Sequence, residues 1–170
     1  MFGLFKRKNP AMLEGQALFE DVLIQAHTHG KAFFADLTPT DDDHLRQQRF
    51  EVVSLFMVVL LWRMKGEETL VKTAQAAYDT MFLSFDRSLR EGGVGDIGVS
   101  HRIKKYAQAF HGRLKSYGEA LDTGETALLT AIENNMKLPR AELEPLAKGA
   151  YIWAQSLKKQ PITTFKTTKH

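Results

Sequence analysis

The sequence predicts an all-α fold, a single-domain bundle of about six helices around a buried central helix at about 40–65. Apolar residues recur at three- and four-residue spacing along most of the chain, and strand-like alternation is absent. A length of 170 residues with 44% hydrophobic content is enough for one core. We expect a helical domain at 10–158 between a basic flexible N-terminus at 1–9 and a basic flexible tail at 159–170.

The first helix is expected over about 10–29. Asn9 and Pro10 have the pattern of an N-cap followed by proline at the first helical position, where no N–H is needed. Three apolar residues then follow at four-residue spacing before Gly30: Leu18, Val22 and Ala26.

The second helix is expected at the centre of the bundle. Thr40 can cap it, and Asp41, Asp42 and Asp43 place negative charge where the first-turn N–H groups are exposed. Its continuation is apolar on nearly every face: Phe50, Val53, Leu55, Phe56, Met57, Val59, Leu60 and Trp62. A helix that is apolar all round is expected to be buried all round.

Helical periodicity returns at Leu70 and stops at Gly92-Gly93, which predicts a third helix. A fourth helix is marked by one apolar seam: Ile103, Tyr106, Ala107, Phe110, Leu114 and Tyr117.

The last two helices are bounded by caps and prolines. Asp122 with Glu125 resembles a capping box at the start of the fifth helix, which ends before Pro139. The sixth ends by Pro161 and is marked by four apolar residues: Leu146, Ala150, Trp153 and Leu157.

Basic residues are concentrated in three blocks without any acid, at 1–9, 101–117 and 158–170, which together hold twelve Lys and Arg. Because the whole chain carries only +3, the rest of it is acidic. Each block is either a contact surface or solvated charge without a partner. The small net charge does not indicate a general nucleic-acid binder, and DNA is not an expected partner.

Motifs for catalysis, metals and cofactors are missing from the sequence. No Cys is present, which excludes disulfides, thiolate-bound zinc, iron–sulfur clusters and thiol catalysis, and which suits a reducing compartment. His27 and His29 point about 200° apart on a helix, so they cannot share a metal ion. The glycine run at 92–96 follows a helix and lacks the Lys-Ser/Thr ending of a phosphate-binding loop. We expect no catalytic residue, no metal site and no cofactor.

The N-terminus is a candidate for contact with a membrane surface. Its apolar part is too short for a secretory signal, and the longest apolar stretch, 52–62, is too short to cross a bilayer. Six residues can still lie on anionic lipid: Phe2, Leu4, Phe5, Lys6, Arg7 and Lys8. A solvated terminus is the alternative. The expected location is the cytoplasm, with the inner face of the cell membrane as a peripheral site.

Two residues between 86 and 117 depart from local helix preferences. Glu91 falls in the last turn of the third helix, where the macrodipole disfavours an anion. We therefore expect it to form an ion pair that fixes the turn, with Arg87, Arg102 or Lys105. Gly112 lies inside the fourth helix, where glycine costs about 0.5–1 kcal/mol relative to alanine. It permits close approach of either a neighbouring helix or a partner.

A basic face is expected on the fourth helix, opposite its apolar seam. Four residues form one stripe and three cations flank it: Lys104, Gln108, His111 and Lys115, with Arg102, Lys105 and Arg113. Such a face suits anionic lipid, RNA phosphate or an acidic patch on a protein. An apolar client segment would also need a groove, and Met57, Met64 and Met81 either line such a groove or pack in the core.

A joint motif runs through this segment: Leu89-Arg90-Glu91, Gly93-Val94-Gly95-Asp96, Val99, Lys104, Phe110-His111-Gly112-Arg113 and Tyr117. With this motif the chain resembles the ubiquinol–cytochrome c chaperone family, most strongly over about 84–118. The resemblance implies that the motif and its neighbours contact a partner: Asp86, Arg90, Glu91, Gly93, Gly95, Asp96, Arg102, Lys104, Lys105, His111, Gly112, Arg113 and Tyr117.

The resemblance implies a non-catalytic assembly chaperone for respiratory complex III, acting on newly made cytochrome b. Family members in mitochondria are associated with a small partner subunit, with ribosomes and with the inner membrane, so these stay open as further partners. The short chain, without a transit peptide of useful length, resembles a bacterial-type member. Two other classes stay open, an RNA- or ribosome-binding module and a helical enzyme of lipid or quinone metabolism.

Overall fold

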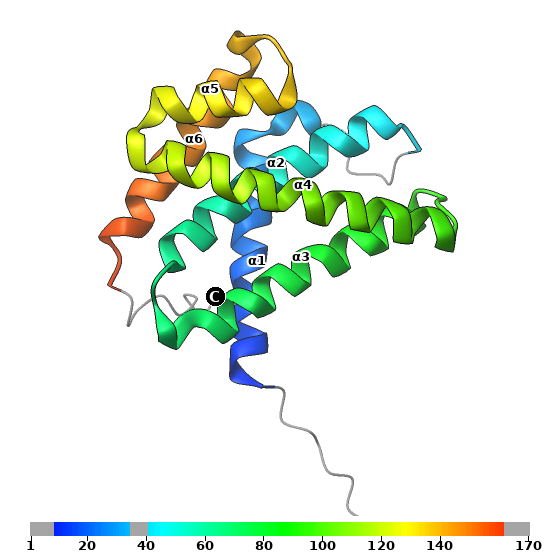
Figure 1. Cartoon of the computed structure of the whole chain (residues 1–170), viewed down its shortest axis with the longest axis horizontal. Helices are drawn as coiled ribbons and strands as arrows, with labels where there is room; N and C mark the ends of the chain where they lie inside the picture. Colours follow the sequence, from blue (N-terminus) through cyan, green and yellow to red (C-terminus); the bar gives the residue numbers. More distant parts are fainter. Residues whose placement is uncertain (1–8, 35–40, 162–170) are drawn as a thin grey trace, which may run out of the picture.

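A computed structural model describes residues 9–34 and 41–161, which form an all-α bundle (Figure 1). The helices are α1 (Pro10–His29), α2 (Asp43–Met64), α3 (Val71–Glu91), α4 (Asp96–Thr123), α5 (Glu125–Met136) and α6 (Arg140–Lys159). Two short 3-10 helices lie between them, η1 (Lys31–Phe33) and η2 (Glu68–Leu70). The described part of the chain contains no strand, so the predicted fold class is confirmed. None of these helices has the length and hydropathy that crossing a bilayer requires.

Segments 1–8, 35–40 and 162–170 lie outside the described residues. The membrane contact expected at the N-terminus therefore stays a prediction, because all six of its residues lie there: Phe2, Leu4, Phe5, Lys6, Arg7 and Lys8. Most of the two basic ends lies there too.

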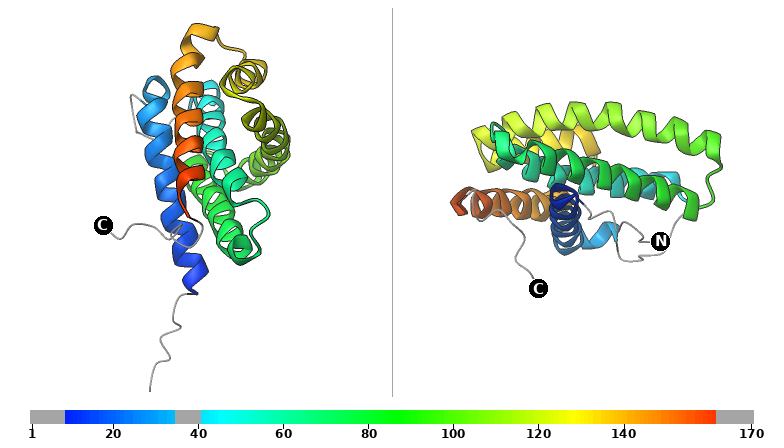
Figure 2. Two further views of the ribbon diagram at one scale, coloured as in Figure 1. Left: turned by 90° about the vertical axis from the view of Figure 1, so that its left-hand side faces the viewer. Right: turned by 90° about the horizontal axis from the view of Figure 1, so that it is seen from below.

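The central helix is α2, as predicted. Every residue from Phe50 to Leu60 is buried, because all five of the other α-helices pack against it (Figure 2). The helix begins later than expected. The Asp42 carboxylate accepts hydrogen bonds from the N–H groups of His44 (2.8 Å) and Leu45 (3.3 Å), so Asp42 is the N-cap, and Thr40 lies outside the described residues.

Helix α1 packs closely along α3 because Gly15 lets the two backbones approach. A Cβ on Gly15 would lie 2.6 Å from the Cβ of Ala76 and 2.7 Å from the backbone nitrogen of Ala77. Helix α6 contacts both α1 and α2, and Gly149 leaves room there for the ring of His29.

The connection from α4 to α5 differs from the expected capping box. Asp122 lies in the last turn of α4, where its carboxylate accepts a hydrogen bond from the indole N–H of Trp62 (2.9 Å). Helix α5 instead begins after Gly124, whose φ of 145° is a conformation that favours glycine. The predicted ends of α5 before Pro139 and of α6 before Pro161 are confirmed.

Helices α3 and α4 meet at residues 92–95 and diverge away from that turn (Figure 1). The end of α2 lies behind the space between their diverging parts. This arrangement leaves one face of the bundle open at the point where the candidate site lies.

Candidate functional site

The turn between α3 and α4 is a Schellman motif. The N–H of Gly93 bonds to the C=O of Arg90, and the N–H of Val94 bonds to the C=O of Leu89, both at 3.0 Å. Gly93 has a φ of 86°, which residues with a side chain rarely adopt. Leu89 is buried and Val94 packs against the core. The backbone of the turn therefore requires glycine at 93.

Charged side chains hold this turn from both sides. The Arg90 guanidinium bridges Asp86, at 2.7 Å, and Asp96 on the other side of the turn. From α2, Arg46 donates a hydrogen bond to the C=O of Gly92 at 2.6 Å. The ion pairs of Arg90 thus stabilise the turn, and Arg46 ties it to the start of α2.

Arg102 belongs to the same network and does not pair with Glu91. Its guanidinium donates to both oxygens of Asp43, at 2.7 and 2.9 Å, and Arg46 donates to the same carboxylate at 2.6 Å. The hydrogen bonds from Arg102 and then Arg46 lower the pKa of Asp43. Glu91 is exposed and forms no ion pair with any described residue. The expected ion pair of Glu91 is therefore wrong, since Arg90 fixes the turn instead.

Arg113 points into the bundle. Its Nε and Nη2 donate to Oε2 and Oε1 of Glu51 at 3.0 and 2.6 Å, and Gln47 donates to the same carboxylate at 3.0 Å. Glu51 is only 3% exposed. One turn further along α4, Tyr117 is fully buried, and its burial raises the pKa of the phenol. The predicted basic face is therefore corrected, because Arg113, like Arg102, ties α4 to α2.

The solvent side of α4 keeps the rest of the predicted face, all of it exposed: Lys104, Lys105, Gln108, His111 and Lys115. Gly112 lies on the same side. A Cβ on Gly112 would meet nothing within 4 Å, so packing inside the described part of the chain does not require this glycine.

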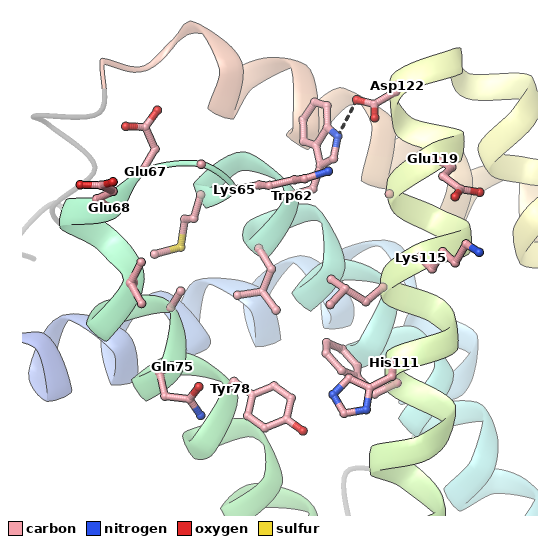
Figure 3. A pocket seen from close by; sticks show the side chains of 18 residues that line it. Trp62, Lys65, Glu67, Glu68, Gln75, Tyr78, His111, Lys115, Glu119 and Asp122 are labelled. Carbon is pink, nitrogen blue, oxygen red and sulfur yellow. Dashed lines mark hydrogen bonds between the residues drawn. The ribbon is translucent and has the colours of Figure 1, made fainter.

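A groove with a volume of about 1050 Å³ opens where α3 and α4 diverge (Figure 3). It lies between the last turns of α2, the first turns of α3 and the second half of α4. Its walls are mainly apolar: Leu61, Met64, Val71, Ala74, Phe110 and Leu114. Val71 is 63% exposed, so part of this apolar lining faces solvent directly.

The two ends of the groove differ in chemistry. Tyr78 of α3 and His111 of α4 lie at one end, with ring centroids 6.4 Å apart (Figure 3). Toward the other end the lining carries four carboxylates, from both walls: Glu67, Glu68, Glu119 and Asp122. Lys65 also lies there, and Lys158 of α6 lies 4.8 Å from the centroid of the Trp62 ring. Arg63 lies beside this end as well. Among the residues that line the groove itself, the four carboxylates outnumber the two lysines, Lys65 and Lys115, and we call the end that carries the carboxylates the acidic end.

Most of the groove is not evident from the sequence. The apolar seam of α4 includes Phe110 and Leu114, but periodicity does not reveal that a cavity lies beside them. Of the three methionines, Met64 lines the groove, whereas Met57 and Met81 are buried in the core. Gly118 in the groove wall could have been found, because glycine inside a helical pattern is itself a signal.

The described residues contain no cluster of three side chains able to hold a metal ion. His27 and His29 face different neighbours, since His27 lies edge-on to Phe34 and His29 stacks on Phe56. The groove, with apolar walls and a charged rim, is suited to holding an apolar polypeptide segment.

Two comparisons with known proteins give a match. Residues 43–169 match the family described as ubiquinol-cytochrome C chaperone. The crystal structure of the Cbp3 homolog from Brucella abortus is similar, with a TM-score of 0.71 and 32% identity over 94% of this chain and 89% of that one. No curated protein sequence matches this chain. The family match covers α2 to α6 and hence every residue that lines the groove.

Proposed function

The chain belongs to the ubiquinol–cytochrome c chaperone family, and we propose that it holds newly made cytochrome b in the groove between α3 and α4. Its role is in the assembly of ubiquinol–cytochrome c reductase, respiratory complex III. A chaperone role is non-catalytic, because the client leaves chemically unchanged.

The open apolar groove is the observation that carries this proposal. Proteins rarely leave a continuous apolar surface exposed unless it binds something. The groove's volume of about 1050 Å³ slightly exceeds the roughly 300–1,000 Å³ of small-molecule pockets. A segment of a membrane protein that has not yet reached its final place has the apolar surface that such a groove can cover.

Exposed cations on α4 extend the proposed contact surface beyond the groove. Lys115 lines the groove, and Lys104 and Lys105 lie about three turns closer to the start of the helix. Their charge suits acidic client residues or anionic headgroups near the client. The turn motif contributes to the proposed site indirectly, because its ion pair between Arg90 and Asp96 holds the end of α3 to the start of α4.

Binding of RNA is less favoured than binding of a protein client. The basic block at 101–117 holds five Lys and Arg, but Arg102 and Arg113 are engaged by carboxylates of α2. Three exposed lysines remain on this helix for phosphate, whereas the apolar groove has no evident use in binding a polyanion.

Photo-crosslinking from α3 tests the client site. Val71 lines the groove and is 63% exposed, whereas Leu83 lies on the same helix outside the groove and is 68% exposed. A photoreactive amino acid at position 71 should crosslink to newly made cytochrome b, and the same amino acid at position 83 should not. Equal crosslinking from both positions would show that contact is not localised to the groove.

Deletion of the gene tests the role itself. We expect assembled complex III to fall while synthesis of cytochrome b continues, since the proposed action follows translation. A deletion strain with normal complex III would contradict the role, whatever the crosslinking shows.

A further inference from the structure

We propose that the occupant of the groove is an α-helical apolar segment with Lys or Arg at one end, and that it packs against the backbone of α4 at Gly118. This inference rests on the proposed function and names the part of the client that is held. It follows from the length of the groove, the open space at one glycine and the charge at one end.

The length and polarity of the groove fit a helix. Along α4 the lining runs from Phe110 to Asp122, about 18 Å at 1.5 Å per residue, or roughly three helical turns. The lining on the facing side is also largely apolar, so it offers few partners for backbone N–H and C=O groups. A helix satisfies those groups internally, whereas an extended segment would leave them unpaired.

Gly118 marks the place where the occupant's backbone can approach α4 most closely. Glycine inside a helix is normally unfavourable, and at Gly15 and Gly149 packing accounts for it. A Cβ on Gly15 would lie 2.6 Å from Ala76, and a Cβ on Gly149 would overlap the ring of His29. A Cβ on Gly118 would meet nothing within 4 Å, although Gly118 lies in the groove wall. Small residues let helix backbones pack closely in this way.

The charge at the acidic end determines the orientation of the occupant in the groove. In the groove lining, four carboxylates stand against two lysines, Lys65 and Lys115, whereas Arg63 and Lys158 lie beside the acidic end and outside the lining. Lys and Arg flank apolar membrane segments on their cytoplasmic side. A segment of that kind would place its cations beside the acidic end and its apolar part between α3 and α4.

Peptide binding to the full chain tests the inference. The probe is a fluorescent synthetic peptide of about twelve alanines and leucines, roughly three helical turns, with lysines at one end. Gly118→Leu should weaken binding about tenfold or more, since the side chain would fill the space that the occupant's backbone uses. Gly112→Leu is the matched control, because Gly112 lies on the same helix, also faces open space and is outside the groove.

A second peptide tests the role of charge, and unfolding measurements test whether the glycine variants keep their fold. A peptide with glutamates in place of the lysines should bind at least about tenfold more weakly. Both glycine variants should keep the unfolding midpoint of the parent chain or raise it, so that weaker binding by Gly118→Leu reports the groove and not loss of fold.

Several outcomes would overturn the inference. They are unchanged peptide binding by Gly118→Leu, an equal loss with Gly112→Leu, and equal binding of the two peptides. If the parent chain sediments as a dimer that Gly118→Leu dissociates, a second copy occupies the groove and the inference is also wrong. Crosslinking of cytochrome b from position 71 is measured separately, so its presence or absence distinguishes failure of this inference from failure of the proposed function.

Discussion

Glu51 places a carboxylate in the middle of the most buried helix of the molecule. It is 3% exposed, and its charge is met by Arg113 from α4 and by the amide of Gln47. A buried ion pair of this kind contributes little to the net free energy of unfolding. Removing one partner is nevertheless strongly destabilising, because the other charge then remains buried without a counter-ion. The pair therefore specifies how α4 must sit on α2.

Replacing Arg113 by methionine should destabilise the fold by about 3–5 kcal/mol, because Glu51 would remain buried without its cation. Arg102→Met is the matched comparison, since it breaks an ion pair with the exposed Asp43 and should cost no more than about 1 kcal/mol. Urea denaturation of both variants measures the difference. Equal losses of unfolding free energy in the two variants would show that the pair of Glu51 and Arg113 is solvated. The double variant Glu51→Gln with Arg113→Met should recover part of the stability that Arg113→Met loses.

At the scale of elements, helix positions follow from the sequence because periodicity and terminal residues act locally. Pro10, Gly30 and Gly92 mark helix ends that the structure keeps. The prediction of a capping box at Asp122 is wrong, because the Asp122 carboxylate accepts a hydrogen bond from Trp62, a residue sixty positions away. No local rule can anticipate such a long-range partner.

Two glycines of the turn should respond differently to alanine. Gly93 has a φ of 86°, so Gly93→Ala should cost about 1–2 kcal/mol of unfolding free energy. Gly95 has a φ of −72°, and a Cβ there would meet nothing within 4 Å, so Gly95→Ala loses only the preference for glycine over alanine at the N-cap of α4 and should cost less than Gly93→Ala. Thermal and urea unfolding of both variants check this. If Gly95→Ala proved as costly as Gly93→Ala, backbone conformation would not explain why glycine stands at 93.

At the scale of the whole molecule, the sequence identifies the segment that forms the turn and the wall of the site on α4. It does not reveal the groove beside that wall. Periodicity shows which face of a helix is buried, yet it does not show how far apart two neighbouring helices lie. Arg90, Arg102 and Arg113 form ion pairs inside the chain that periodicity does not reveal, and their expected contact with a partner stays a prediction. The groove begins beyond Tyr78 and His111, where the aromatic contacts between α3 and α4 end, and this is a property of tertiary packing.

The exposed lysines of α4 provide a test of the charged surface as a whole. Lys104, Lys105 and Lys115 are exposed, so changing all three to glutamate should leave the unfolding free energy within about 0.5 kcal/mol per site. We expect less newly made cytochrome b to co-purify with this variant at about 0.1 M salt, and the difference should shrink at about 1 M, where screening acts over about 3 Å.

A second triple variant separates local charge from net charge. Lys31, Lys137 and Lys148 are also exposed, and none of them belongs to α4 or lines the groove, so changing them to glutamate alters the net charge of the chain equally. If this variant loses as much cytochrome b as the α4 variant, the chain acts through its overall charge and the α4 lysines are ordinary solvated residues. A loss confined to the α4 variant, and removed by salt, is the result that a charged contact beside the groove requires.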